Sequence, residues 1–169
     1  HFLENIDVPL FSGVDTRKLV RYLTNGKSKS HKSVLTFSEQ VPAKSVFESA
    51  RLKTDDLPLV SQKAPIVHIP GDNPIVVMNY GIKQAIIDQL MTLKMPLVSL
   101  PHNADLATIK KYNPRLIFLS NGPGDPRNFT KEIEVVREIF SLNVPVRAIC
   151  LGHQLIALAL GIKIIKLPF

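Results

Sequence analysis

From Pro74 onward, short apolar runs alternate with stretches whose apolar residues recur at helical spacing. The apolar runs predict strands at residues 75–78, 96–100, 116–119, 146–149 and 162–167. The stretches between them predict helices at residues 82–93, 104–111, 130–140 and 151–160. Strands and helices in strict alternation form parallel sheets through right-handed crossovers. Residues 75–169 therefore predict a doubly wound parallel α/β sheet.

Residues 55–74 contain four prolines, at positions 58, 65, 70 and 74, and one glycine. Such a composition cannot form a regular helix, so we interpret residues 61–74 as a linker. Within it, residues 66–69 are apolar and β-branched enough to form a short edge strand. His68 lies in this run, and the sequence indicates no partner for it.

The first 60 residues predict part of a smaller α/β domain. Asp15 can cap a helix that ends before Gly26, residues 34–37 form a strand, and residues 43–52 form a second helix. Asp15 is also a candidate interface residue, although helix capping explains it more simply. The expected organisation is thus a partial first domain (1–60), a linker (61–74) and an α/β domain (75–169).

Composition excludes several classes of protein. The chain has 169 residues, 45% of them hydrophobic, one cysteine and a net charge of +7. Much of the charge lies in the lysine-rich stretch 27–32, which is typical of a solvated loop and predicts no nucleic-acid partner. No apolar run is long enough to span a membrane. A single cysteine fits a reducing compartment, and we expect the cytoplasm, leaving an organelle open.

A β-branched run leads directly into a helix-forming run at Cys150. A strand that turns sharply into a helix here would lift the sulfur onto an exposed elbow, where the free N–H groups of the helix favour the thiolate. Gly152 gives such a turn room. A lone cysteine among apolar neighbours is also typical of a buried small hydrophobe, so spacing alone leaves both interpretations open.

A second turn, Ser-Asn-Gly-Pro-Gly-Asp-Pro at residues 120–126, follows the predicted strand 116–119. Two glycines around a proline can expose N–H groups or let the backbone approach a ligand. Taken alone, the segment is also typical of a plain strand-to-helix turn. Because the carboxyl ends of parallel strands meet at one edge, we expect this loop beside Cys150. One of its N–H groups and that of Leu151 could then hold an oxyanion.

Four segments together resemble a known family. They are Gly-Val-Asp-Thr-Arg at 13–17, Asn-Tyr-Gly-Ile-Lys at 79–83, the loop at 120–126, and Ala-Ile-Cys-Leu-Gly-His-Gln at 148–154. The last two resemble the triad-type glutamine amidotransferases. The first two narrow the resemblance to the small subunit, or the fused amidotransferase part, of carbamoyl-phosphate synthetase. The resemblance covers nearly the whole chain.

This resemblance implies a reaction in which a cysteine attacks the side-chain amide of L-glutamine, ammonia leaves, and water hydrolyses the thioester. Cys150 matches the nucleophile. The residues that match the oxyanion and glutamine contacts are Gly122, Gly124, Leu151 and Gln154. Ammonia would pass to a large subunit or fused synthetase domains, which bind ATP and Mg²⁺ and make carbamoyl phosphate for pyrimidine or arginine synthesis. No cofactor and no metal are expected in this chain.

His153 lies close to Cys150 in sequence, but on a helix its side chain should point away from an elbow sulfur, so we interpret it as structural. In the resembled family the catalytic histidine and its acidic partner lie further downstream than Phe169, and a serine lies before His1. We therefore expect a fragment with negligible glutaminase activity when alone. Ala148 also stands where the family usually has glycine.

Two other functions stay open at this point. An anthranilate synthase-type amidotransferase shares the cysteine motif, although it is not expected to carry the segment 14–17. A non-catalytic binding or regulatory fragment would keep the fold and perform no hydrolysis.

Overall fold

The computed structural model describes residues 12–24, 34, 40, 42–49 and 57–165. The chain divides into two compact units, His1–Leu52 and Lys53–Phe169. The second unit contains the whole predicted strand–helix alternation and includes the stretch 61–74 that the sequence assigns to a linker.

In the first unit the described residues form the helices α2 (Thr16–Thr24) and α3 (Lys44–Ser49). Asp15 caps α2 as predicted, because its Oδ1 atom accepts a hydrogen bond from the N–H of Lys18 at 2.9 Å. The predicted strand at 34–37, the lysine-rich stretch 27–32, Gly26 and residues 50–52 lie partly or wholly outside the described residues.

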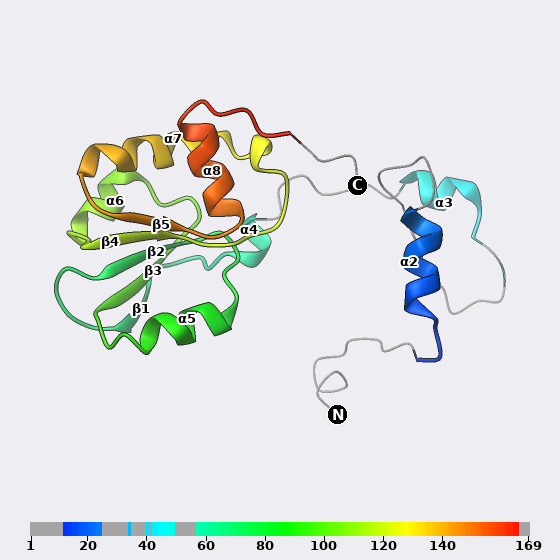
Figure 1. The fold of residues 1–169 in the computed structure, drawn as a ribbon, viewed down its shortest axis with the longest axis horizontal. Coiled ribbons are helices and arrows are strands. Elements are labelled where there is room, and N and C mark those ends of the chain that lie inside the picture. Colours follow the sequence, from blue (N-terminus) through cyan, green and yellow to red (C-terminus); the bar gives the residue numbers. More distant parts are fainter. Residues whose placement is uncertain (1–11, 25–33, 35–39, 41, 50–56, 166–169) are drawn as a thin grey trace. The chain divides into compact units, whose positions relative to one another are not determined.

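The second unit follows the predicted order closely (Figure 1). Its elements are α4 (Leu57–Val60), β1 (Ile66–Ile69), β2 (Ile75–Asn79), α5 (Gln84–Met91), β3 (Leu97–Pro101), α6 (Leu106–Lys111), β4 (Leu116–Leu119), η1 (Pro126–Asn128), α7 (Thr130–Ile139), η2 (Phe140–Leu142), β5 (Val146–Ala148) and α8 (Leu151–Ala159). The predicted edge strand at 66–69 is confirmed as β1.

The sheet has the strand order β1-β3-β2-β4-β5. Strands β2 to β5 pair in parallel, whereas β1 pairs antiparallel with β3, so the predicted parallel sheet is a mixed one. Helix α5 covers one face, and α6, α7 and α8 cover the other (Figure 1). The doubly wound α/β fold is therefore confirmed. The strand order reverses at β2, and ligands of such sheets bind where the strands end near this point.

Each face of the sheet packs its own hydrophobic core. Successive residues of β2 alternate between the two cores, as the pleat of a strand requires. The core under α5 contains Ile75, Val77, Ile87, Leu97 and Phe118. The larger core under the other three helices includes Val76, Met78, Leu119, Val136, Leu151 and Leu155. Burial on both faces explains why the inner strands β2 and β4 are almost continuous apolar runs.

The strand predicted at 162–167 is wrong for residues 162–165, which form no strand; residues 166–167 lie outside the described part. The cause is the end of α8. Gly161 has φ +79°, its N–H donates to Leu158, and the N–H of Ile162 donates to Ala157 at 2.8 Å. This left-handed helix cap turns the chain away, so an apolar run that would suit a strand does not pair with β5.

The first prediction concerns Gly152. A Cβ atom here would lie 2.6 Å from the Cβ of Leu119 and closer still to the Leu119 carbonyl oxygen. Since the obstacle is backbone, Gly152→Ala should destabilise the chain by about 3 kcal/mol, the upper end for overpacking. At Gly161 a Cβ would meet nothing within 4 Å, so Gly161→Ala should cost only about 1 kcal/mol, for its positive φ. Urea unfolding followed by circular dichroism measures both, and equal losses would contradict the steric explanation.

Candidate functional site

Strands β4 and β5 bring the two predicted turns to the same edge of the sheet. Leu119 and Ala148, the last residues of these strands, are paired in the parallel ladder. The N–H of Ile149 continues the ladder by donating to the carbonyl of Leu119 at 3.0 Å. The loop 120–126 and Cys150 therefore begin side by side at the carboxyl edge, as predicted.

Cys150 forms the elbow between β5 and α8. Its backbone has φ +51° and ψ −110°, in a region that residues other than glycine rarely adopt. Such a conformation costs about 1–3 kcal/mol and persists only where the surroundings enforce it. The residue is exposed, so the alternative of a buried small hydrophobe is wrong. The next residue, Leu151, is the first of α8, where the N–H has no acceptor within the helix.

Gly122 and Gly152 allow the loop and the elbow to lie in close contact. A Cβ atom on Gly122 would overlap the carbonyl oxygen of Tyr80 and lie 2.7 Å from Cδ2 of Leu151. The N–H of Gly152 donates to the carbonyls of both Ser120 and Ile149 at 3.0 Å. The backbone after β4 thus packs directly against the end of β2 and the first turn of α8.

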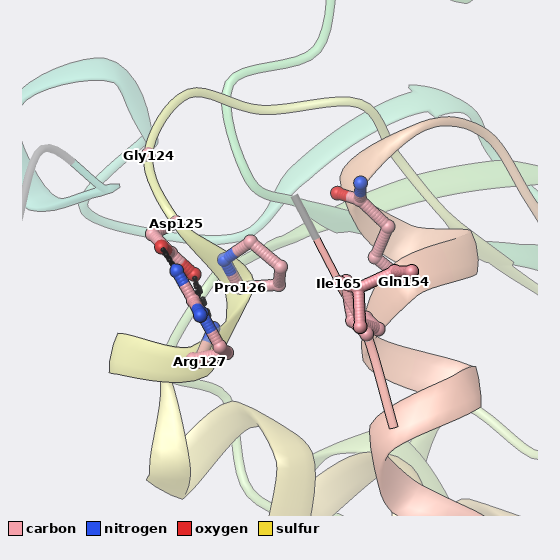
Figure 2. A pocket seen from close by; sticks show the side chains of 7 residues that line it. Gly124, Asp125, Pro126, Arg127, Gln154 and Ile165 are labelled. Atoms are coloured by element: carbon pink, nitrogen blue, oxygen red, sulfur yellow. Dashed lines mark hydrogen bonds and ion pairs between the residues drawn. The ribbon is translucent and has the colours of Figure 1, made fainter. Parts of the chain in front are cut away.

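A cavity of about 430 Å³ lies beside these turns, within the size range of small-molecule sites. Its lining consists of Gly124, Asp125, Pro126, Arg127, Gln154, Ile164 and Ile165. In Figure 2 the side-chain amide of Gln154 lies on one side and the Asp125–Arg127 pair on the other. Two predicted glutamine contacts, Gly124 and Gln154, therefore share this cavity, whereas Gly122, Leu151 and Cys150 are not among its lining residues.

Asp125 and Arg127 form an ion pair in the cavity wall that the sequence did not predict. The Nε of Arg127 donates to Oδ1 of Asp125 at 2.8 Å, and its Nη2 contacts Oδ2. This pairing raises the pKa of Arg127, through the hydrogen bond first and the charge second. Oδ1 also accepts the backbone N–H of Arg127 at 3.0 Å, which caps η1. The wall of the cavity therefore carries both signs of charge.

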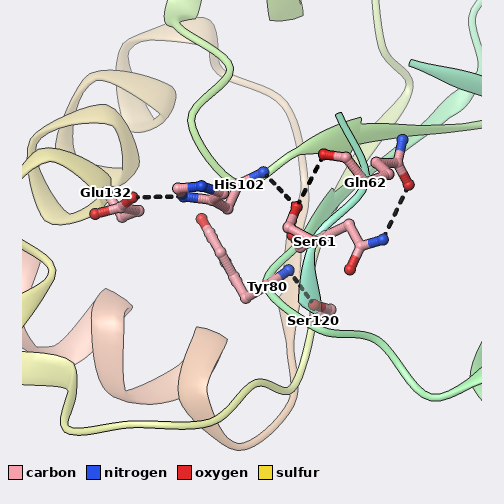
Figure 3. A network of polar contacts seen from close by, with 7 residues as sticks. Ser61, Gln62, Tyr80, His102, Ser120 and Glu132 are labelled. Carbon is pink, nitrogen blue, oxygen red and sulfur yellow. Dashed lines mark hydrogen bonds and ion pairs between the residues drawn. The ribbon is translucent and has the colours of Figure 1, made fainter. Parts of the chain in front are cut away.

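A second polar cluster lies at the ends of β2 and β3 (Figure 3). The Nδ1 of His102 lies 2.8 Å from Oε1 of Glu132 on α7, and both side chains are largely buried. Tyr80 is fully buried beside them; burial first, and the charge of Glu132 second, raise the pKa of its hydroxyl. Among the described side chains this hydroxyl is buried without a hydrogen-bond partner. Nothing in the local sequence signalled this cluster, because its members lie about 20 to 50 residues apart.

His68 also has a partner, contrary to the sequence-based expectation. Its Nε2 atom lies 2.9 Å from the Oγ of Ser99, because antiparallel pairing places β1 beside β3. Burial lowers the pKa of His68, which favours the neutral ring. The Oγ of Ser99 also donates to Gln62 at 2.8 Å, and Gln62 in turn accepts from Asn79.

His68 lies on β1 and His102 directly follows β3, strands that are not adjacent to β5 in the sheet. Three strand spacings separate β3 from β5, or about 14 Å, and four separate β1 from β5. His153 is exposed on the first turn of α8. In the described ranges, no three His, Cys, Asp or Glu side chains gather as a metal site would need. None of the described helices combines the length and apolar character needed to cross a bilayer.

Comparison with known protein families identifies the family of this chain. Residues 76–169, more than half of the chain, match the family described as "Glutamine amidotransferase class-I". The chain belongs to this family. The resemblance drawn from the cysteine motif and the 120–126 loop is therefore confirmed for a class-I glutamine amidotransferase.

Three similar proteins are small chains of carbamoyl phosphate synthase. The carbamoyl phosphate synthase small chain of Thermotoga maritima is 36% identical over 171 residues, covering 99% of this chain and 44% of the relative. That of Methanococcus maripaludis is 37% identical over 177 residues, covering 99% and 48%. A carbamoyl phosphate synthase pyrimidine-specific small chain of Halalkalibacterium halodurans is 34% identical over 165 residues, covering 96% and 44%. The chain thus spans less than half the length of these relatives.

The second prediction concerns the thiol of Cys150. An exposed sulfur at a helix N-terminus should react with iodoacetamide at pH 7 about ten times faster in the native chain than in the same chain unfolded in urea. The expectation rests on the exposed position of the sulfur at the start of α8, which unfolding abolishes. Mass spectrometry of the alkylated chain gives both rates. Native alkylation as slow as, or slower than, that of the unfolded chain would show an inert cysteine.

Proposed function

We propose that this chain is the glutamine-hydrolysing part of a carbamoyl-phosphate synthetase, with L-glutamine as substrate. The observation that carries the proposal is the exposed Cys150, held at φ +51° where β5 turns into α8. Support comes from the names of the relatives, which are carbamoyl phosphate synthase small chains. Those names do not favour an anthranilate synthase-type amidotransferase.

In the proposed reaction Cys150 is the nucleophile. Its thiolate attacks the side-chain amide carbon of glutamine, a C–S bond forms, and the carbonyl electron pair moves onto oxygen. The N–H groups of Leu151 and Gly122 hold that oxyanion, since both belong to backbone fixed before the substrate arrives. The amide nitrogen of the intermediate then takes up a proton from a general acid as its C–N bond breaks, so it leaves as ammonia and a thioester remains. Water, activated by the same group acting as a base, attacks the thioester, the C–S bond breaks, and glutamate and the Cys150 thiolate are released.

Gln154 and Gly124 have the role of substrate contacts in this proposal. Both line the cavity beside the elbow. A primary amide can donate and accept at once, so Gln154 suits a zwitterionic amino acid. Gly124 has φ +91°, and a Cβ there would lie 2.7 Å from Phe129, so the position requires glycine. Its backbone can then lie at the cavity surface without a side chain in the way.

The general base is proposed to lie outside the described histidines. His102 is engaged by Glu132 and His68 by Ser99, and the strands that lead to them, β3 and β1, are three and four positions from β5 in the sheet. His153 is exposed on the helix itself. A positioned base-acid is worth about 10² to 10⁴ in rate, so the reaction requires one.

Ammonia is proposed to pass to a large synthetase subunit or fused synthetase domains, which use ATP and Mg²⁺. One relative's name specifies pyrimidine synthesis; we propose that pathway or arginine synthesis for this chain.

The third prediction compares carbamoyl phosphate synthesis from glutamine with synthesis from free ammonia. In the full-length protein with its synthetase partner, Cys150→Ser should lower glutamine-dependent carbamoyl phosphate formation by about 10³ or more, because the nucleophile is lost. Formation from ammonium chloride should stay unchanged, since free ammonia needs no thioester. Both rates are measured on the same preparation. Undiminished glutamine-dependent synthesis would refute the role of Cys150, and glutamine-dependent amination of chorismate would point to the anthranilate type.

The fourth prediction concerns His153. In the same complex, His153→Ala should keep glutamine-dependent synthesis within about threefold, far from the 10² to 10⁴ that loss of a base brings. In the 169-residue chain alone, neither wild type nor this variant should release ammonia from glutamine above background. A coupled glutamate dehydrogenase assay measures the ammonia. Turnover by the chain alone that disappears in His153→Ala would identify His153 as the base.

A further inference from the structure

Ser120 connects the three segments that meet at the elbow. It follows β4 directly and is completely buried. Its N–H donates to the carbonyl of Met78 at 3.2 Å, and its carbonyl accepts the N–H of Gly152 at 3.0 Å. Its hydroxyl accepts the N–H of Tyr80 at 2.9 Å, as Figure 3 shows, and donates to the carbonyl of Asn121 at 2.8 Å. Every polar group of this residue is therefore used.

The last of these bonds acts on the peptide unit that contains the Gly122 N–H. The carbonyl of Asn121 and the N–H of Gly122 belong to one planar trans unit, so they point in opposite directions. A hydroxyl that holds the carbonyl on its own side consequently turns the N–H to the other side. Gly122 lies against Leu151, the first residue of α8. The orientation of this one peptide thus decides whether the loop presents a donor.

The Ser120 hydroxyl also makes the Gly122 N–H a stronger hydrogen-bond donor. Tyr80 N–H donates to Ser120, whose O–H donates to Asn121, and each bond polarises the next. An oxyanion accepting from Gly122 would complete this chain of hydrogen bonds. The side chain of Asn121 fixes the loop independently, since its Nδ2 donates to the carbonyl of Gly81 at 3.0 Å. Loss of the Ser120 hydroxyl would therefore release the peptide without releasing the whole loop.

We infer that Ser120 is a positioning residue whose hydroxyl orients the Gly122 N–H toward the oxyanion; the inference rests on the proposed glutamine hydrolysis. It acts through the peptide and does not touch the substrate. The elbow itself does not depend on the hydroxyl, because Gly152 is bonded to the carbonyl of Ser120. A variant that lacks the Ser120 hydroxyl should therefore lose oxyanion stabilisation while the reactivity of the Cys150 thiol stays unchanged.

The test uses Ser120→Ala in the full-length protein with its synthetase partner. The kcat of glutamine-dependent synthesis should fall at least tenfold, since removal of one oxyanion donor costs about 10² to 10³ and here the donor is only misdirected. KM for glutamine should change less than threefold, and synthesis from ammonium chloride should not change. The iodoacetamide rate of Cys150 should stay within twofold, which also reports an intact elbow.

Ser99→Ala is the matched control. Ser99 is a buried serine whose hydroxyl bonds Gln62, on the far side of β2 from β4. This variant should leave kcat unchanged. Ser120→Thr retains the hydroxyl and should recover kcat to within threefold of wild type.

A kcat in Ser120→Ala equal to that of Ser99→Ala would overturn the inference while leaving the glutaminase proposal intact. Absence of glutamine-dependent synthesis in the wild type would instead refute the proposed function. A crystal structure of the wild type with more than 3.5 Å between Ser120 Oγ and the Asn121 carbonyl oxygen would overturn the inference even if the variants failed to fold.

Discussion

The site depends on how closely the first turn of α8 lies against the end of β4. Gly152 makes this possible, because any side chain there would overlap Leu119. Its N–H donates to two carbonyls, those of Ser120 and Ile149, which directly follow β4 and β5. With both neighbours held, Cys150 has no room for an ordinary backbone conformation and adopts φ +51°. Burial of Leu151 and Leu155 in the larger core offsets the strain.

The reaction proposed for this site relies on backbone groups more than on charged side chains. The ends of β2, β4 and β5 meet next to the point where the strand order reverses, and they contribute N–H groups, a hydroxyl and glycines. Such donors are already oriented before a substrate binds, so they stabilise developing charge without reorganising. Among the side chains described at this edge, Arg127 forms an ion pair with Asp125, and the ring of His102 contacts the carboxyl group of Glu132.

Secondary structure was predictable where burial is two-sided. The two inner strands β2 and β4 consist almost wholly of apolar residues, and the predicted bounds agree with β2 to β5 within one residue at either end. The run at 162–167 is also rich in isoleucine and leucine, but its described residues 162–165 form no strand, because the cap at Gly161 turns the chain away. The antiparallel direction of β1 could not be predicted, since its partner β3 lies some 30 residues later.

The order of strands and helices, the turn at Cys150 and the glycine loop after β4 can all be read from local composition, because each depends on residues adjacent in the chain. The hydrogen bonds that join these segments into one site cannot be predicted from local composition. Tyr80 and Ser120 are 40 residues apart, and His102 and Glu132 are 30 apart. Residues so distant meet only after the sheet has assembled, and the strand order then sets which side chains lie within hydrogen-bond distance.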